Sequence, residues 1–230
     1  MLVFPHHRNL PVIGMTPYRN ITGQLGLIVL LPLLLSLVSI AGADDCHETV
    51  MIDSVEYTVT DYWCGQMIDS SAIAKPEHLV KLPQELTFED YRIYVLPQAR
   101  DAFVKMAEAA RKDSVELIVD SGFRSPAFQR RIINKRLASG DSFDEVLNSV
   151  APPGYSEHHT GRAFDLCPSE ARFAFTETYR WLKENASRYG FFETLPEDPN
   201  APLTWESWHW TYRGESDSAS VKLSPDSADN

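Results

Sequence analysis

The feature that most constrains this chain is a dense run of polar and metal-binding side chains at residues 155–165, Tyr-Ser-Glu-His-His-Thr-Gly-Arg-Ala-Phe-Asp. A second run, Trp-Glu-Ser-Trp-His-Trp, occupies residues 205–210. Two imidazoles and one carboxylate form a common open zinc shell, in which the fourth position is left to water. His158, Asp165 and His209 can supply that shell, and Glu206 can act as a general base beside the water. Any fold for this chain must therefore bring two distant segments together.

The spacing of the first run predicts a turn between His158 and Asp165. On an α-helix these two positions share a face but lie about 10.5 Å apart along the axis. Donor atoms on one zinc ion must come within about 4 Å of each other, because metal–ligand distances are near 2 Å. The chain therefore has to fold back, and Gly161 is placed to allow it. Spacing does not choose between His158 and His159 as the ligand, and each run taken alone also fits polar residues on a solvent-exposed face.

Apolar spacing along the rest of the chain predicts a mixture of helices and strands. Helices are expected from Pro97, from Pro126 to near Gly140 and over 173–189, with a short helix behind a Ser142–Glu145 capping box. Strands are expected where β-branched and aromatic residues gather, at 55–59, 62–64, 115–119, 162–166, 191–192 and 205–212. Because strands and helices follow one another without a regular βαβ alternation, the pattern favours an α+β domain.

The first 43 residues are typical of a targeting segment rather than of a folded domain. A basic flank precedes an apolar run at 25–40, which ends in Ala-Gly-Ala at 41–43. This order predicts a secretory signal cleaved after Ala43, so that the mature chain begins at Asp44. The alternative is an uncleaved membrane anchor over residues 25–43. Both interpretations predict export to the periplasm or the extracellular space, and only the second places the protein on a membrane.

Composition limits the partners. The formal net charge is -11, which argues against nucleic acid because phosphate binding needs an excess of Lys and Arg. Residues 214–230 are rich in Ser and Asp and are predicted to be disordered. We expect a monomer whose substrate is captured by a local site rather than by bulk charge.

Three cysteines are present. In an oxidising compartment, Cys46 and Cys64 can pair and staple the start of the mature chain. Cys167 is then left over. Because Cys167 lies two residues after Asp165, it is a candidate fourth metal ligand, but we favour a buried free thiol.

Three motifs occur in a fixed order. They are Ser-Gly-Phe-Arg-Ser at 121–125 with Gln129, then Ser-x-His-x-x-Gly-x-Ala-x-Asp at 156–165, then Glu-x-x-His at 206–209. Together they resemble the zinc D-alanyl-D-alanine carboxypeptidases of the vancomycin-resistance (VanY-like) type, relatives of the D,D-dipeptidases and of the hedgehog amino-terminal domain. The resemblance covers residues 90–213. It implies a single zinc peptidase domain with a central antiparallel sheet flanked by helices.

The resemblance also implies roles for individual residues. It implies that one Zn²⁺ per chain is bound by His158, Asp165 and His209. Glu206 is then the base, and His159 is not a ligand. Arg124 is then expected to bind a substrate carboxylate or the tetrahedral oxyanion, a task that suits an always-charged planar guanidinium. Gln129 and Ser156 are expected to line the substrate groove.

The implied reaction is removal of the terminal D-Ala from peptidoglycan stem peptides. Alternatives that share the motifs are an L,D-carboxypeptidase and a peptidoglycan endopeptidase. A non-catalytic zinc-containing binding protein is a further alternative, which predicts damage to the base or the ligands, and here all four positions are intact. Residues 44–89 fall outside the resemblance, so a prodomain-like cap, a partner surface and a wall-anchoring spacer all stay open for them.

Overall fold

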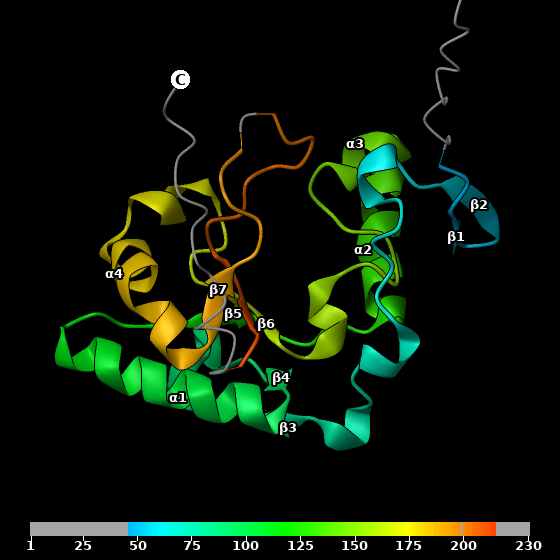
Figure 1. Ribbon diagram of the computed structural model, residues 1–230. Helices are drawn as coiled ribbons and strands as arrows, with labels where there is room; N and C mark the ends of the chain where they lie inside the picture. Colours follow the sequence, from blue (N-terminus) through cyan, green and yellow to red (C-terminus); the bar gives the residue numbers. More distant parts are fainter. Residues whose placement is uncertain (1–45, 199, 215–230) are drawn as a thin grey trace, which may run out of the picture. The chain divides into compact units, whose positions relative to one another are not determined.

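The computed structural model describes residues 46–198 and 200–214 (Figure 1). The predicted signal or anchor and all but the first residue of the predicted disordered tail lie outside this range. Within it, no helix is both long and apolar enough to cross a membrane.

A four-stranded antiparallel sheet forms the centre of the described chain. Its order is β5 (Val119–Ser121), β6 (Ala163–Leu166), β8 (His209–Tyr212) and β7 (Phe191–Glu193). All four residues of β6 are buried, because helix α1 covers one face of the strand and the other faces the interior of the site. The expected central antiparallel sheet flanked by helices is therefore confirmed.

The described part of the chain has four α-helices, and their starts are set locally. α1 (Pro97–Lys112) and α2 (Pro126–Ala138) each begin with a proline, which is tolerated there because the first helical N–H has no intrahelical partner. Ser142 caps α3 (Phe143–Leu147) in the expected capping box with Glu145. Thr176 caps α4 (Glu177–Asn185) by accepting a hydrogen bond from the backbone N–H of Tyr179.

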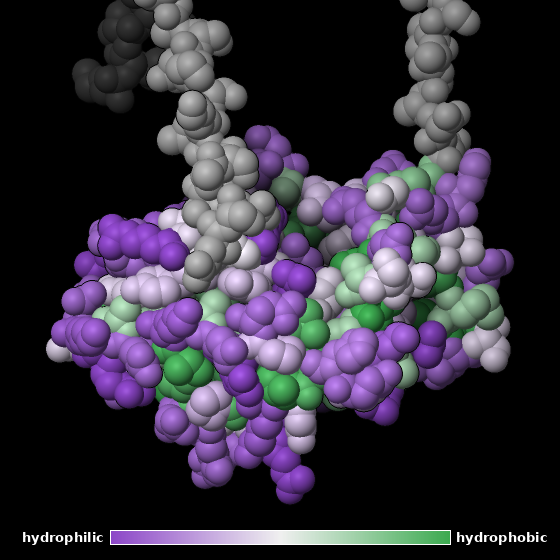
Figure 2. All heavy atoms as spheres, turned by 60° about the horizontal axis from the view of Figure 1, so that its bottom comes forward, coloured by the Kyte–Doolittle hydropathy of each residue, from purple (hydrophilic) through white to green (hydrophobic). Residues whose placement is uncertain are grey.

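Helix α1 is amphipathic and runs beneath the sheet in Figure 1. Its buried face includes Phe103, which stacks on Phe164 of β6 with 4.9 Å between ring centroids. The opposite face carries exposed charged residues, and the side of the molecule where α1 lies is largely hydrophilic with scattered apolar patches (Figure 2). Burial of the apolar face against the sheet is the main stabilisation of this helix.

Buried apolar residues form two clusters. The first joins the sheet to α1 and α4 and includes Phe103, Phe164 and Trp210. The second joins α2 and α3 to a hairpin of β1 (Thr49–Ile52) and β2 (Val55–Thr58), with Trp63 and Tyr155 inside it. Two short strands, β3 (Val80–Lys81) and β4 (Tyr94–Val95), pair with each other.

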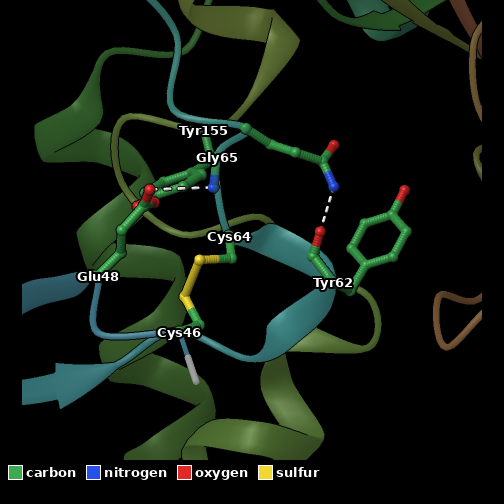
Figure 3. Close-up of a disulfide and its surroundings, with 7 residues drawn as sticks. Cys46, Glu48, Tyr62, Cys64, Gly65 and Tyr155 are labelled. Atoms are coloured by element: carbon green, nitrogen blue, oxygen red, sulfur yellow. Dashed lines mark hydrogen bonds between the residues drawn. A yellow bond between two sulfur atoms is a disulfide. The ribbon is translucent and has the colours of Figure 1, made fainter. Parts of the chain in front are cut away.

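A disulfide between Cys46 and Cys64 ties the start of the hairpin to the turn that follows it (Figure 3). The predicted pairing is therefore confirmed, and Cys167 is the free cysteine of the described residues. Its thiol is half-buried rather than buried, so that part of the prediction is wrong.

Several predicted elements differ from the observed ones. Residues 62 and 63 belong to a 3-10 helix at Asp61–Trp63, and Cys64 to the turn after it, rather than to a strand, because Trp63 turns into the second apolar cluster. The helix predicted over 173–189 is divided into a 3-10 helix at Ala171–Phe175, α4, and a 3-10 helix at Ala186–Tyr189, since Thr176 takes an extended conformation to cap α4. Strand structure begins at Val119 and His209, later than expected.

The stacked pair of Phe103 and Phe164 gives a prediction for stability. Phe103 is fully buried, so Phe103→Ala should lower the free energy of unfolding by about 3–5 kcal/mol, through lost burial and the cavity left behind. Phe175→Ala is the matched control because that ring is 86% exposed, and it should change the same quantity by less than about 0.5 kcal/mol. Urea denaturation followed by circular dichroism measures both, and equal losses would contradict the assignment of this core.

Candidate active site

The sheet register brings two of the expected ligands face to face. Asp165 of β6 and His209 of β8 are direct partners across neighbouring antiparallel strands. His158 arrives from a one-turn 3-10 helix at Glu157–Thr160, which Gly161 ends in the left-handed conformation with φ of 67°. The fold-back expected at Gly161 is therefore confirmed, and a side chain there would press on the backbone N of Leu96 at 3.3 Å. The metal-binding atoms of the three residues lie within 4.8 Å of one another, close to the spacing of about 4 Å that a shared zinc requires.

His158 is held as a neutral imidazole with one nitrogen free. Burial, together with the nearby charge of Arg124, lowers the pKa of His158 to about 4. Its Nδ1 lies 2.6 Å from the carbonyl oxygen of Gly122 and therefore donates to it. Nε2 then carries the lone pair, lies 3.1 Å from Asp165 Oδ2 and has no hydrogen-bond partner among the described residues. A buried lone pair without a donor is the state of a metal ligand.

Gly122 allows this carbonyl to approach the ring. A Cβ at position 122 would come within 2.6 Å of Ile93 Cγ2 and 2.9 Å of the carbonyl oxygen of Tyr94. Only glycine lets the segment at 121–125 pass this close to β4. The motif at 121–125 thus orients His158, the candidate metal ligand in the motif at 156–165.

His209 lies between two carboxylates. Its Nδ1 is 3.0 Å from Asp165 Oδ1, and its Nε2 is 2.9 Å from Glu157 Oε2. Burial acts to lower the pKa of His209, but the two carboxylates outweigh burial and raise the pKa to about 10. Positive charge, whether a proton or a metal ion, is therefore favoured at this point.

Glu157 is the residue of the site that sequence reasoning missed. Its Oε2 accepts hydrogen bonds from His209 Nε2 and from the hydroxyls of Thr194 at 2.5 Å and Thr211 at 2.9 Å. Burial acts to raise the pKa of Glu157, but these donors hold it at about 2. Its position beside His158 in the first run was the only sequence signal, because its partners come from distant strands.

His159 has a different task from His158. Its Nδ1 lies 2.6 Å from the carbonyl oxygen of Arg124, and its Nε2 accepts the backbone N–H of Gly154 at 3.1 Å. Both ring nitrogens are therefore occupied by backbone groups, and His159 is outside the group of residues that can hold a metal. Cys167 is outside that group as well.

Arg124 and Glu206 complete the charged set. Arg124 Nη2 lies 3.4 Å from Asp165 Oδ2, and its Nε is buried without a partner within the described chain. Burial acts to raise the pKa of Asp165, but His158 and Arg124 hold it well below its usual range. Burial raises the pKa of Glu206 to about 7, with the charge of Asp165 adding to the rise and His209 opposing it. A carboxyl group with this pKa is poised to exchange protons at neutral pH.

These groups line one groove of about 710 Å³, within the usual range for ligand sites. The groove brings together all seven residues singled out in the sequence: Arg124, Gln129, Ser156, His158, Asp165, Glu206 and His209. Gln129 is 1% exposed; its Nε2 donates to the carbonyl oxygen of Ala151 at 2.9 Å, and its Oε1 has no partner within the described part of the chain. That buried acceptor is available to a substrate N–H.

A family model for VanY, D-alanyl-D-alanine carboxypeptidase, matches residues 92–215. The chain belongs to this family. A D-alanyl-D-alanine carboxypeptidase of Enterococcus faecalis is 30% identical over 182 residues, which cover 75% of this chain and 66% of the relative. The chain spans between 42% and 66% of the length of the curated relatives it matches.

Solved structures of an LD-carboxypeptidase and of VanYB share the fold. The LdcB LD-carboxypeptidase is similar with a TM-score of 0.59 and 26% identity, over 76% of this chain and 87% of that one. VanYB in complex with D-alanine-D-alanine gives a TM-score of 0.51 and 27% identity, over 67% of this chain and 89% of that one.

The two adjacent histidines allow a direct test of the ligand set. His158→Ala should abolish the binding of one zinc per chain because it removes the free Nε2. His159→Ala should keep that stoichiometry while lowering the melting temperature, since it removes two buried hydrogen bonds. Elemental analysis of dialysed, zinc-loaded protein decides the point, and zinc loss in His159→Ala alone would reverse the assignment.

Glu157 should control how His209 presents its Nδ1. Loss of a group that orients a metal-binding histidine typically weakens metal affinity about 10–100-fold, which we expect for Glu157→Ala. Glu157→Gln keeps an acceptor for His209 Nε2 and should weaken zinc binding less. Competition with a chromophoric chelator measures these affinities, with exposed Glu108→Ala as the control. Unchanged affinity in Glu157→Ala would show that His209 is oriented by other contacts.

Proposed function

We propose that this protein is a zinc-dependent D,D-carboxypeptidase that removes the terminal D-Ala of peptidoglycan stem peptides. The observation that carries the proposal is the convergence of His158, Asp165 and His209 in a groove that Glu206 and Arg124 also line. Membership of the VanY family and the fold shared with VanYB, which has been solved with D-alanine-D-alanine, support the same substrate class.

The donor set fits zinc. Two imidazole nitrogens and one carboxylate oxygen are ligands that zinc prefers in open catalytic sites, and the orphaned Nε2 of buried His158 lacks the partner that a metal supplies. His158, Asp165 and His209 hold the ion in this proposal. When bound, zinc supplies Lewis acidity that lowers the pKa of a coordinated water and polarises a carbonyl group.

The chain's own residues handle protons and charge. Glu206 accepts a proton from the attacking water and returns it to the nitrogen of the departing D-Ala as the peptide C–N bond breaks. Arg124 offers its guanidinium to the substrate carboxylate or to the oxyanion that develops on the former carbonyl oxygen. Gln129 Oε1 and the Ser156 side chain, both buried in the groove wall, position the peptide.

An L,D-carboxypeptidase is the second candidate, favoured by the similarity to the LdcB LD-carboxypeptidase. The two reactions use the same site and differ in the bond that is cut. Digestion of defined tetrapeptide and pentapeptide muropeptides, followed by mass spectrometry, separates them and also detects endopeptidase cleavage within the stem. Release of D-Ala from the pentapeptide supports the proposal, and cleavage of the tetrapeptide alone contradicts it.

A cell-wall substrate requires export. The signal-like sequence at 1–43, with cleavage after Ala43, supports export to the periplasm or the extracellular space, where we expect the protein to act as a monomer. Amino-terminal sequencing of the exported protein tests whether the chain starts at Asp44 or keeps residues 25–43 as an anchor.

Two substitutions separate chemistry from binding. Glu206→Gln keeps the shape of the side chain but cannot accept a proton, so turnover should fall about 10²–10⁴-fold while zinc stays bound. Arg124→Ala should lower kcat/KM strongly with zinc retained; a change confined to KM assigns Arg124 to ground-state binding, and an equal fall in kcat assigns it to the transition state. Steady-state kinetics with parallel zinc analysis gives both results, and near-normal turnover of Glu206→Gln would place the base elsewhere.

A further inference from the structure

The groove has a wall that the three motifs do not supply. Tyr62, Gln66 and Ile68 line the same cavity as His158, Asp165 and Glu206. They belong to the turn after the first hairpin, whereas the family model begins at residue 92. A segment without an assigned role therefore faces the candidate metal centre.

A disulfide and hydrogen bonds to Glu48 fix this segment in place. Cys64 is joined to Cys46, and the carboxylate of Glu48 accepts hydrogen bonds from the backbone N–H of Gly65 at 3.0 Å and from the Tyr155 hydroxyl at 2.6 Å (Figure 3). Tyr155 directly precedes the motif that carries His158. The wall is thus attached to the same stretch of chain that carries the ligand.

Two further contacts attach the segment to the end of α3 and to the loop that leads to the motif. Trp63 is buried in the second apolar cluster and donates its Nε1–H to the carbonyl oxygen of Leu147. The backbone N–H of Ile68 donates to the carbonyl oxygen of Gly154 at 2.9 Å. Tyr62, by contrast, is only half-buried and in Figure 3 extends away from the disulfide and Glu48.

The chemistry of the wall suits an uncharged peptide backbone. Residues 62–68 read Tyr-Trp-Cys-Gly-Gln-Met-Ile and carry no charged side chain. Burial raises the pKa of Tyr62; a side-chain hydrogen bond with Gln66 opposes the rise and the negative charge of Glu157 adds to it, so the phenol stays a neutral hydrogen-bond donor. Gln66 is exposed, and its Nε2 donates to the carbonyl oxygen of Tyr62, which leaves its Oε1 as an acceptor. This acceptor, with the ring and the hydroxyl of Tyr62, offers stacking and hydrogen bonds to amide groups.

A carboxypeptidase holds only one residue beyond the bond it cuts. Most of a groove of about 710 Å³ is therefore open to the residues that precede that bond. We infer that Tyr62 and Gln66, held by the Cys46–Cys64 disulfide, bind the stem peptide on the amino-terminal side of the cleaved bond and make the enzyme prefer long peptides over a D-Ala-D-Ala dipeptide. This inference rests on the proposed function, because it takes the groove to hold a stem peptide.

The test compares a stem pentapeptide with N-acetyl-D-Ala-D-Ala in zinc-loaded full-length protein. Tyr62→Ala should lower kcat/KM for the pentapeptide roughly 5–10-fold, the size of one aromatic contact, and mainly through KM. The dipeptide should stay within about twofold, and zinc content should not change. Tyr62→Phe separates the hydroxyl from the ring, and Val55→Ala, an exposed residue of the preceding hairpin, is the control. Equal losses on both substrates, or no loss on either, would overturn the inference.

Binding is measured separately by calorimetry, so that the two proposals can fail independently. Suppose that the unsubstituted protein cleaves neither peptide but binds the pentapeptide more tightly than N-acetyl-D-Ala-D-Ala, and that Tyr62→Ala removes this difference. The inference about Tyr62 and Gln66 is then supported, and the proposed reaction is contradicted. If both peptides are cleaved and bound equally well, the proposed reaction is supported and the inference about Tyr62 and Gln66 is contradicted. The Cys46→Ser/Cys64→Ser variant adds a second arm: it should lose the preference for length while retaining one zinc per chain.

Discussion

Burial of Asp165 is the constraint on which the rest of the site depends. A carboxylate removed from water is costly unless positive or hydrogen-bonding partners surround it. Here His209 faces it across the sheet, His158 reaches it from the turn that ends at Gly161, and Arg124 approaches the same carboxylate from the segment before α2. Three segments far apart in the sequence, at 121–125, 156–165 and 206–209, therefore meet at one negative charge. The same charge that makes this convergence necessary gives the centre its affinity for a cation.

The two apolar clusters fix the groove from opposite sides. Trp208 packs on the first cluster, which joins the sheet to α1 and α4, while Trp63 and Tyr155 belong to the second, which contains α2, α3 and the first hairpin. All three residues line the cavity. Because each wall is anchored in its own core, the groove is built largely before a ligand arrives, which lowers the entropic cost of binding. The disulfide adds covalent support to the wall that contains Tyr62 and Gln66.

Elements whose signals are local were predicted well. Pro97, Pro126 and the Ser142–Glu145 capping box mark helix starts through the backbone groups of one turn, and the structure confirms all three. Predictions that depend on distant packing fared worse. The stretch 62–64 has strand-like composition, yet Trp63 turns inward and donates to the carbonyl oxygen of Leu147.

The sequence alone determined the family, the α+β class, the pairing of Cys46 with Cys64 and the set of residue types that meet at the centre, because ordered motifs and local backbone chemistry carry that information. Only the tertiary structure distinguished the environments of His158 and His159, and only it revealed Glu157. The physical reason is that a histidine's role is set by what its two nitrogens meet. Those partners (Gly122, Arg124, Gly154, Asp165 and, for His209, Glu157) are brought together by the sheet and the turn at Gly161, and sequence spacing does not contain their distances.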